Sequence, residues 1–146
     1  MIERDLYLGI DPGISGGIAL LSANGDVVDL SPMPDTEKDV VDHLRELSPR
    51  VKYAVLEKVG PMPKQGIAST AKFMKQYGVL IGVLFALDIR FEDVRPQVWQ
   101  HALNCRTGGD KNVSKRKAQQ LFPQQKITHA VADAALIAEY ARRSKQ

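Results

Sequence analysis

This sequence has little of several features that mark particular protein classes. Its 146 residues include one cysteine, Cys105, so no disulfide can form within the chain and no oxidising compartment is indicated. The longest apolar run, Val79–Leu87, is far shorter than the roughly 20 residues that a membrane-spanning helix needs. The N-terminal residues Met1–Asp5 lack the charged-then-apolar layout of a signal peptide. We therefore expect a soluble, intracellular, cytoplasmic protein with no membrane partner.

The composition is that of an ordinary globular protein with a mild basic excess. Hydrophobic residues make up 44% and charged residues 25%, and the length fits a single domain, residues 1–146, with a sizeable core. The formal net charge is +3 and the isoelectric point about 9.0. Such a balance permits binding to nucleic acid but does not by itself demonstrate it.

The order of elements predicts an α/β domain. Short apolar runs separated by the Gly-rich turn at 12–17 and by Asn24-Gly25 predict three antiparallel strands, and Tyr53–Leu56 reads as a central strand parallel to the first. Thr36 is placed to cap the first helix. We expect a mixed sheet with flanking helices, with strands at 6–10, 18–21, 27–30, 53–56 and 89–94 and helices at 36–47, 67–86, 96–103, 114–122 and 128–143.

Three acidic residues, remote along the chain, fall where this scaffold could bring them together. Asp11 directly follows one apolar strand, and Glu57 ends another. Asp133 interrupts an otherwise apolar helical stretch. Functional groups in open α/β sheets gather at the carboxyl ends of strands. Because buried carboxylates are costly unless something compensates them, a divalent cation bound by oxygen ligands is the expected partner.

Each acidic residue also has an ordinary structural explanation. Asp11 could bond its own backbone in the turn with Pro12, and Glu57 could be a solvated strand end. His129, four residues before Asp133, would face the same way as that carboxylate or belong to the cap at Thr128. The joint placement favours a site for two Mg²⁺ ions, with Mn²⁺ as a substitute, that hydrolyses phosphodiesters. Asp11 would bridge the ions, Glu57 and Asp133 would hold one each, and His129 would act as a ligand or as the base for water.

The same motifs resemble the RuvC family of Holliday junction resolvases, in particular its shorter phage-type and related bacterial members. The resemblance covers nearly the whole chain. It is carried by Gly9–Gly13 with Gly17, Leu56-Glu57, Phe73–Gly78, Pro96–Gln100, Lys115–Pro123, and His129 with Ala132–Ala134.

This resemblance implies an RNase H-like fold, a homodimer, and paired symmetric nicks in a four-way DNA junction. It also implies that Asp11, Glu57 and Asp133 are metal ligands. The main departure from the family pattern lies three places before the last Asp, where the residue is usually an acid or histidine and is Ala130 here. His129 is its neighbour and the candidate substitute. Ala135, where Leu is frequent in the family, is a milder departure.

Basic residues are concentrated near the expected acidic site. We predict that this group docks DNA phosphates, with an affinity that falls steeply with salt. Lys58 and Lys64 flank the loop after Glu57, and Met62 at its tip could wedge into an opened junction. The cations of the C-terminal tail, Arg142, Arg143 and Lys145, are better explained as a solvated helix face. The predicted phosphate-docking group is Arg106, Lys111, Lys115, Arg116 and Lys117.

The helix predicted at 67–86 is apolar over a broad arc. Apolar residues beyond those needed for one buried face fit a two-fold dimer interface, although a completely buried central helix would explain them equally well. Gly78 and Gly82, four residues apart, suggest close packing against another backbone.

Other functions remain open at this point. The chain could be a different RNase H-like nuclease, acting on RNA or other branched DNA, or a catalytically weak junction-binding protein. A nucleotide-binding module of the sugar-kinase type also begins with a Gly-Ile-Asp-x-Gly hairpin. That fold normally uses two domains and a second phosphate hairpin, which 146 residues do not supply.

Overall fold

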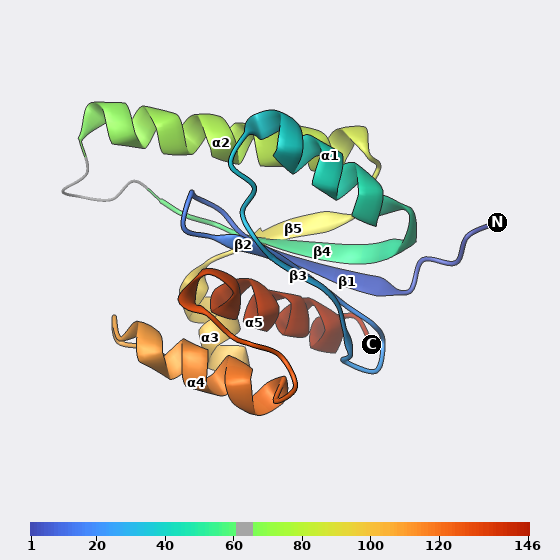
Figure 1. The fold of residues 1–146 in the computed structure, drawn as a ribbon, viewed down its shortest axis with the longest axis vertical. Coiled ribbons are helices and arrows are strands. Elements are labelled where there is room, and N and C mark those ends of the chain that lie inside the picture. The colour runs from blue at the N-terminus through green and yellow to red at the C-terminus, as the bar shows by residue number, and fades with distance from the viewer. Residues whose placement is uncertain (61–65) are drawn as a thin grey trace.

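The centre of the fold is a mixed five-stranded sheet in the order β3-β2-β1-β4-β5. The computed structural model describes residues 1–60 and 66–146, and Figure 1 gives its layout. The strands β1 to β3 pair antiparallel, whereas β4 lies parallel to β1 and β5 parallel to β4. The predicted mixed sheet is therefore confirmed. The strands are β1 (Leu6–Asp11), β2 (Gly17–Leu21), β3 (Val27–Pro32), β4 (Val51–Glu57) and β5 (Phe91–Val94).

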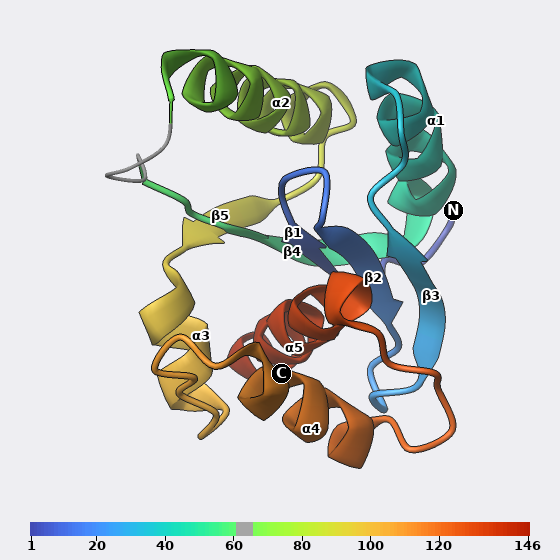
Figure 2. The same ribbon diagram turned by 60° about the vertical axis from the view of Figure 1, so that its left-hand side comes forward.

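Helices cover both faces of this sheet. Figures 1 and 2 show α1 and α2 on one face and α3, α4 and α5 on the other. The helices are α1 (Glu37–Leu47), α2 (Ile67–Ala86), α3 (Pro96–Ala102), α4 (Lys111–Leu121) and α5 (His129–Ser144), with a short 3₁₀ turn η1 (Ser48–Arg50) before β4. Within the described residues, no helix combines the length and apolar character needed to cross a membrane.

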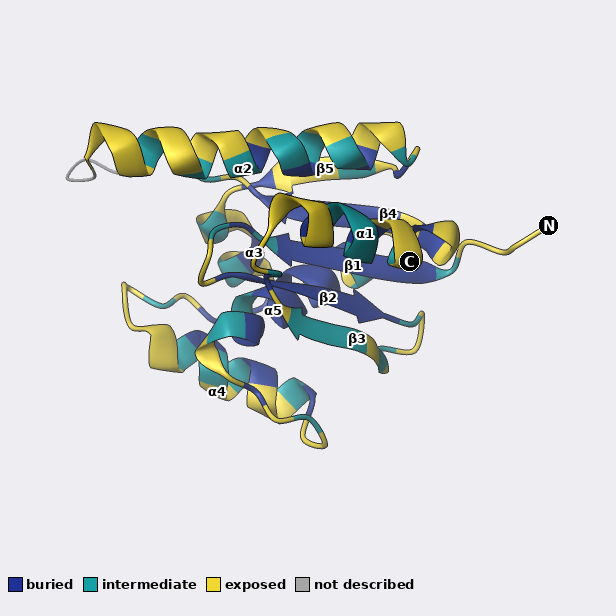
Figure 3. Cartoon of the chain, turned by 45° about the horizontal axis from the view of Figure 1, so that its top comes forward, coloured by how far each residue is buried: buried dark blue, intermediate teal, exposed yellow. Residues whose placement is uncertain are grey.

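The alternation of side chains along β1 decides which face receives the acidic residue at its end. Leu8 and Ile10 are fully buried in the cluster beneath α1 and α2. Tyr7 packs in the other cluster, among residues of α5. Since neighbouring residues of a strand point to opposite faces, Asp11 belongs to the α5 face. Figure 3 shows how completely β1 and α5 are buried compared with α2.

Helix α5 approaches β1 more closely than ordinary side chains allow. A Cβ atom added to Gly9 would overlap the backbone nitrogen of Ala138 and the backbone oxygen of Ala134. A Cβ on Gly17 would lie 2.6 Å from the backbone oxygen of Ala130. Glycine on the strands and alanine on the helix are therefore what permits this contact.

Several predicted boundaries change for identifiable reasons. The Thr36 hydroxyl accepts a 3.0 Å bond from the Asp39 amide and starts α1, as predicted. The helix predicted to begin at Ser114 begins at Lys111, because the Asp110 side chain accepts a 2.9 Å bond from the Asn112 amide. Thr128 stands at the N-cap of α5, but its side chain makes no capping bond.

Two further expectations change. The strand predicted at 89–94 begins only at Phe91, after a turn in which Asp88 has a φ of 56°. The alternative of a completely buried α2 is wrong, since only Tyr77, Leu80 and Leu84 of that helix are buried. The predicted loop residues Met62 and Lys64 lie outside the described residues.

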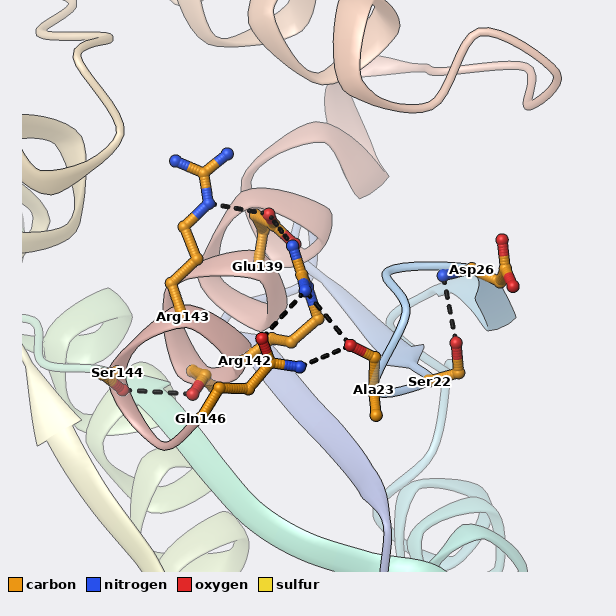
Figure 4. Close-up of polar contacts among 9 residues, drawn as sticks. Ser22, Ala23, Asp26, Glu139, Arg142, Arg143, Ser144 and Gln146 are labelled. Atoms are coloured by element: carbon orange, nitrogen blue, oxygen red, sulfur yellow. Dashed lines mark hydrogen bonds and ion pairs between the residues drawn. The ribbon is translucent and has the colours of Figure 1, made fainter.

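The C-terminal turn of α5 is anchored through Arg142, contrary to the prediction of a solvated face, whereas Arg143 and Lys145 are exposed as predicted. Glu139 is only 3% exposed, and its carboxylate accepts bonds of 2.6 and 2.7 Å from Arg142 and 2.8 Å from Arg143. Arg142 also donates to the backbone oxygen of Ala23, which ties α5 to the β2–β3 hairpin (Figure 4). The Lys145 ammonium lies 4.8 Å from the centre of the Tyr53 ring.

The close α5–β1 contact predicts a large effect of one methyl group. We expect Gly9→Ala to lower the free energy of unfolding by roughly 2–3 kcal/mol, because backbone atoms rather than flexible side chains occupy the space. Urea denaturation followed by circular dichroism measures it. Gly60→Ala is the matched control, since no atom of the described residues lies within 4 Å of its added Cβ. Equal midpoints for the two variants would contradict this account of the packing.

Candidate functional site

The fold places the three predicted carboxylates at one edge of the sheet. Asp11 ends β1 and Glu57 ends β4, and these strands are parallel neighbours in which Ile10 pairs with Leu56. Asp133 lies one turn into α5. The next residue of that helix, Ala134, rests against Gly9 of β1. The sheet register and the helix contact thus bring together three residues that are far apart in sequence.

The carboxylates influence one another electrostatically. Burial raises the pKa of Asp11 to about 8, with further contributions from the charges of Glu57 and Asp133. Burial also raises the pKa of Glu57 to about 7, with the charge of Asp133 adding to it. The pKa of Asp133 is raised as well, again mainly by burial. Like charges disfavour ionisation only when they are close, so the three groups form one coupled site.

The donor chemistry of this site fits a hard divalent cation. Within the described residues, no three His, Cys, Asp or Glu side chains are already arranged to hold one metal ion. Burial and the neighbouring carboxylates both disfavour the ionised forms of Asp11 and Glu57, so their pKa values are raised. Oxygen donors of this kind are the preferred ligands of Mg²⁺ and Mn²⁺. A bound cation would relieve the repulsion between these carboxylates.

His129 is near the site, and its role as a ligand stays a prediction. It is the first residue of α5, it is exposed, and its charge lowers the pKa of Asp133. Ala130 is the position that departs from the family pattern. Its backbone lies against the sheet, because its carbonyl oxygen faces Gly17 of β2. His129 is thus available beside Asp133 without disturbing that contact.

Among the predicted DNA-binding cations, Lys111 is the one that the structure brings to the carboxylates. It is the first residue of α4, and its charge lowers the pKa of both Asp11 and Asp133. Arg106 contacts the Nδ1 atom of His101 at 2.9 Å in the segment before α4. Of the others, Lys58 and Arg116 are exposed, Lys115 and Lys117 are half-buried, and Lys64 lies outside the described residues.

Sequence reasoning missed the polar residues that support the acids. The indole Nε1 of Trp99 donates a 2.8 Å bond to Oε2 of Glu57, and this bond is buried. The Ser114 hydroxyl opposes the rise in the pKa of Asp133. The signal for Trp99 was present, since it is the chain's single tryptophan and sits three residues after a helix-starting proline, Pro96. A buried indole N–H needs an acceptor.

A second missed contact fixes the turn that follows Asp11. The Gly13 amide donates a 2.6 Å bond to Oε1 of Gln76 on α2. Gly13 has a φ of 103°, a conformation that glycine adopts without strain. The turn beside the acidic site is therefore held from the opposite helix layer.

Comparison with solved structures identifies the class of this fold. It is the RNase H-like arrangement of a mixed sheet between helical layers, and it matches solved structures of RuvC over nearly the whole chain. Thermus thermophilus RuvC has 18% sequence identity and a TM-score of 0.64, with 96% of this chain and 95% of that chain covered. The T. thermophilus RuvC in complex with its Holliday junction substrate has 17% identity and a TM-score of 0.63, covering 97% of this chain and 96% of that chain. At this level of identity the likeness shows a shared fold.

The sequence comparisons are negative. No protein-family model matches the sequence, and no curated protein matches it. The predicted RNase H-like, RuvC-type fold is thus confirmed by structure rather than by sequence similarity.

The raised pKa values predict how stability depends on pH without divalent cations. Asp11 and Glu57 have folded-state pKa values of about 8 and about 7, well above the values near 4 of an unfolded chain. Their contribution to stability is fully present below about pH 4 and is lost as the pH rises through 7 and 8. In EDTA, we expect the free energy of unfolding to fall by roughly 1 kcal/mol or more per pH unit between about pH 4 and about pH 8.

Urea titrations at several pH values, with and without Mg²⁺, measure this dependence. Asp11→Asn should flatten the curve and raise stability at about pH 8, because it removes the most perturbed carboxyl group. A flat curve for the wild type, or unchanged behaviour of the variant, would show that the carboxylates are not buried together.

Proposed function

We propose that this protein is a divalent-cation-dependent endonuclease that cuts branched DNA, with the four-way junction as its substrate. The observation that carries the proposal is the group of carboxylates Asp11, Glu57 and Asp133, close enough to influence one another's ionisation, at the edge of a RuvC-like fold. One of the similar structures is a complex with a Holliday junction, which supports branched DNA as the substrate class.

Each residue of the site then has a role. Two divalent cations, when bound, supply a polarised water and compensation for the charge that develops on the phosphate. Asp11, Glu57 and Asp133 would together hold these cations, and the charges of the other two carboxylates act on Asp11. His129, which is exposed, would accept the proton of the attacking water. The Lys111 ammonium binds the phosphate next to the cut.

The DNA backbone is expected to follow the basic surface from Lys58 across the N-terminal part of α4. Lys111 and Lys115 are one helical turn apart and lie on the same side of that helix. Arg106 precedes them, and Arg116 is exposed. Backbone contacts of this kind position the duplex without reading its sequence, and their strength falls with salt.

The exposed side of α2 supports a homodimer. One strip along it recurs at the spacing of a single helix face and contains only apolar or small residues. Among the described residues, nothing lies within 4 Å of a Cβ added to Gly78 or Gly82, so the predicted close packing against another backbone is not made by the described part of the chain. A second copy of α2, brought to this face by a two-fold axis, would fill that space. The face consists of Ile67, Ala71, Met74, Gly78, Gly82 and Phe85.

A second candidate is a junction-binding protein with weak catalytic activity. It is favoured by two observations, namely the Ala130 departure and the absence, among the described residues, of a ready-made three-residue metal cluster. Cation-dependent nicking distinguishes the two functions.

Nicking of synthetic junctions tests the proposed activity. We expect the wild type with Mg²⁺ or Mn²⁺ to cut a mobile four-way junction in preference to three-way, flap, linear and RNA substrates. Asp11→Asn should lose at least about a thousandfold in rate yet bind the junction normally, because only the charge that holds cations is removed. His129→Ala should lose roughly a hundredfold, as for the loss of a general base.

Asp35→Asn, which removes an exposed carboxylate outside the site, is the control and should cut at the wild-type rate. Equal cleavage by Asp11→Asn and the wild type would refute the assigned roles. Junction binding without any cleavage by the wild type would favour the second candidate.

Charge on the α2 face should separate the subunits. Phe85 is 70% and Met74 44% exposed in the single chain, so lysine at either position leaves the folded subunit intact. We expect Met74→Lys and Phe85→Lys to weaken dimerisation at least about tenfold, because like charges would meet across the two-fold axis. Analytical ultracentrifugation measures the dissociation constant.

Val28→Lys is the control, since Val28 is an exposed apolar residue (53%) on β3, outside that face. A monomeric wild type at high concentration would rule out this interface, as would lysine variants that dimerise normally.

A further inference from the structure

Trp99 lies against the candidate site although it is neither acidic nor basic. It is 0% exposed and belongs to the same hydrophobic cluster as Tyr53 and Val55 of β4. Glu57, at the end of that strand, is 9% exposed. The bond from the indole nitrogen to Oε2 of Glu57 is 2.8 Å long and is shielded from water. The neutral indole N–H of Trp99 thus donates a hydrogen bond to one of the carboxylates of the site, Glu57.

The backbone places Trp99 there through a short, constrained connection. Strand β5 pairs with β4 up to Glu57, and the Lys58 amide extends that pairing with a 2.8 Å bond to the Val94 carbonyl. Pro96 then starts α3 after a single intervening residue. Since proline fixes its own φ and suits the first turn of a helix, Trp99 follows one turn later on the buried side. The position of the indole is therefore coupled to the strand that carries Glu57.

The hydrogen bond matters to both partners. A buried indole N–H without an acceptor is costly, so Trp99 needs the carboxylate. The carboxylate is fixed in turn, because a planar indole held within a packed core has little rotational freedom. The bond engages Oε2 and leaves Oε1 for a cation. A similar arrangement is common at metal sites, where a neighbouring group orients the ligand.

We propose that Trp99 is a positioning residue that orients Glu57 to receive a divalent cation. This inference rests on the proposed function, since it assigns Glu57 to the cation site. Its role is distinct from filling the core, because the indole N–H, and not only the volume of the ring, is what acts on the carboxylate. The direct consequence concerns cation affinity, and cleavage is affected only through it.

Because the chain has a single tryptophan, a tryptophan analogue replaces residue 99 and no other residue. Expression in a tryptophan-requiring strain replaces residue 99 alone with 3-benzothienylalanine, which keeps the ring shape but has sulfur in place of N–H. Replacement with 5-fluorotryptophan keeps the N–H and is the matched control. Mn²⁺ affinity is measured for each protein by electron paramagnetic resonance without DNA, and junction affinity and cleavage are measured separately.

We expect the benzothienyl protein to bind Mn²⁺ roughly ten- to a hundredfold more weakly, as is typical when a group that orients a metal ligand is lost. The Mn²⁺ concentration for half-maximal cleavage should rise by the same factor, with junction affinity unchanged. The 5-fluorotryptophan protein should match the wild type in both readouts. Trp99→Phe, made by mutagenesis, should behave like the benzothienyl protein in Mn²⁺ affinity.

Equal Mn²⁺ affinity in the benzothienyl and wild-type proteins would overturn the inference while leaving the nuclease proposal intact. Weakened Mn²⁺ binding in a protein whose wild type cuts no branched DNA would support the role of Trp99 and reject the proposed activity. A wild type that binds no Mn²⁺ would overturn both.

Discussion

The arrangement of the site depends on the contact between α5 and β1. Gly9 has no side chain, so the helix backbone at Ala134 and Ala138 can rest directly on the strand. Asp133 immediately precedes Ala134, and Asp11 lies two residues beyond Gly9, so this contact carries the two carboxylates to the same edge. The parallel pairing of β1 with β4 then adds Glu57. A bulkier residue at position 9 would lift α5 and separate the acidic groups.

Placing three carboxylates together opposes the stability of the fold. Burial and mutual repulsion raise the pKa values of Asp11 and Glu57 to about 8 and about 7. The ionised carboxylates therefore lack sufficient compensating interactions in the protein alone. Lys111, His129 and the Trp99 N–H offset part of this cost. Perturbed acids of this kind cluster at functional sites, where a ligand supplies the missing interaction. A divalent cation would be that ligand here, and its binding would stabilise the folded protein.

Much of this could be predicted from sequence because the relevant patterns are local. Asp11 and Glu57 mark two strand ends, and Asp133 interrupts the apolar stretch 130–137. These three signals are enough to predict the acidic group from the chain alone. The start of α4 could not be placed, because the Asp110 cap competes with several other polar residues in the same loop. The partners of Glu139 and of Glu57 were also missed. They are set by side-chain packing between elements that sequence periodicity does not relate.

The central claim is that these carboxylates converge on divalent cations, and a crystal structure grown with Mn²⁺ tests it most directly. Anomalous scattering identifies manganese independently of the surrounding protein atoms. The account predicts manganese peaks bound by Asp11 together with Glu57 and Asp133. Manganese absent from that edge of the sheet, or bound only elsewhere on the protein, would contradict it.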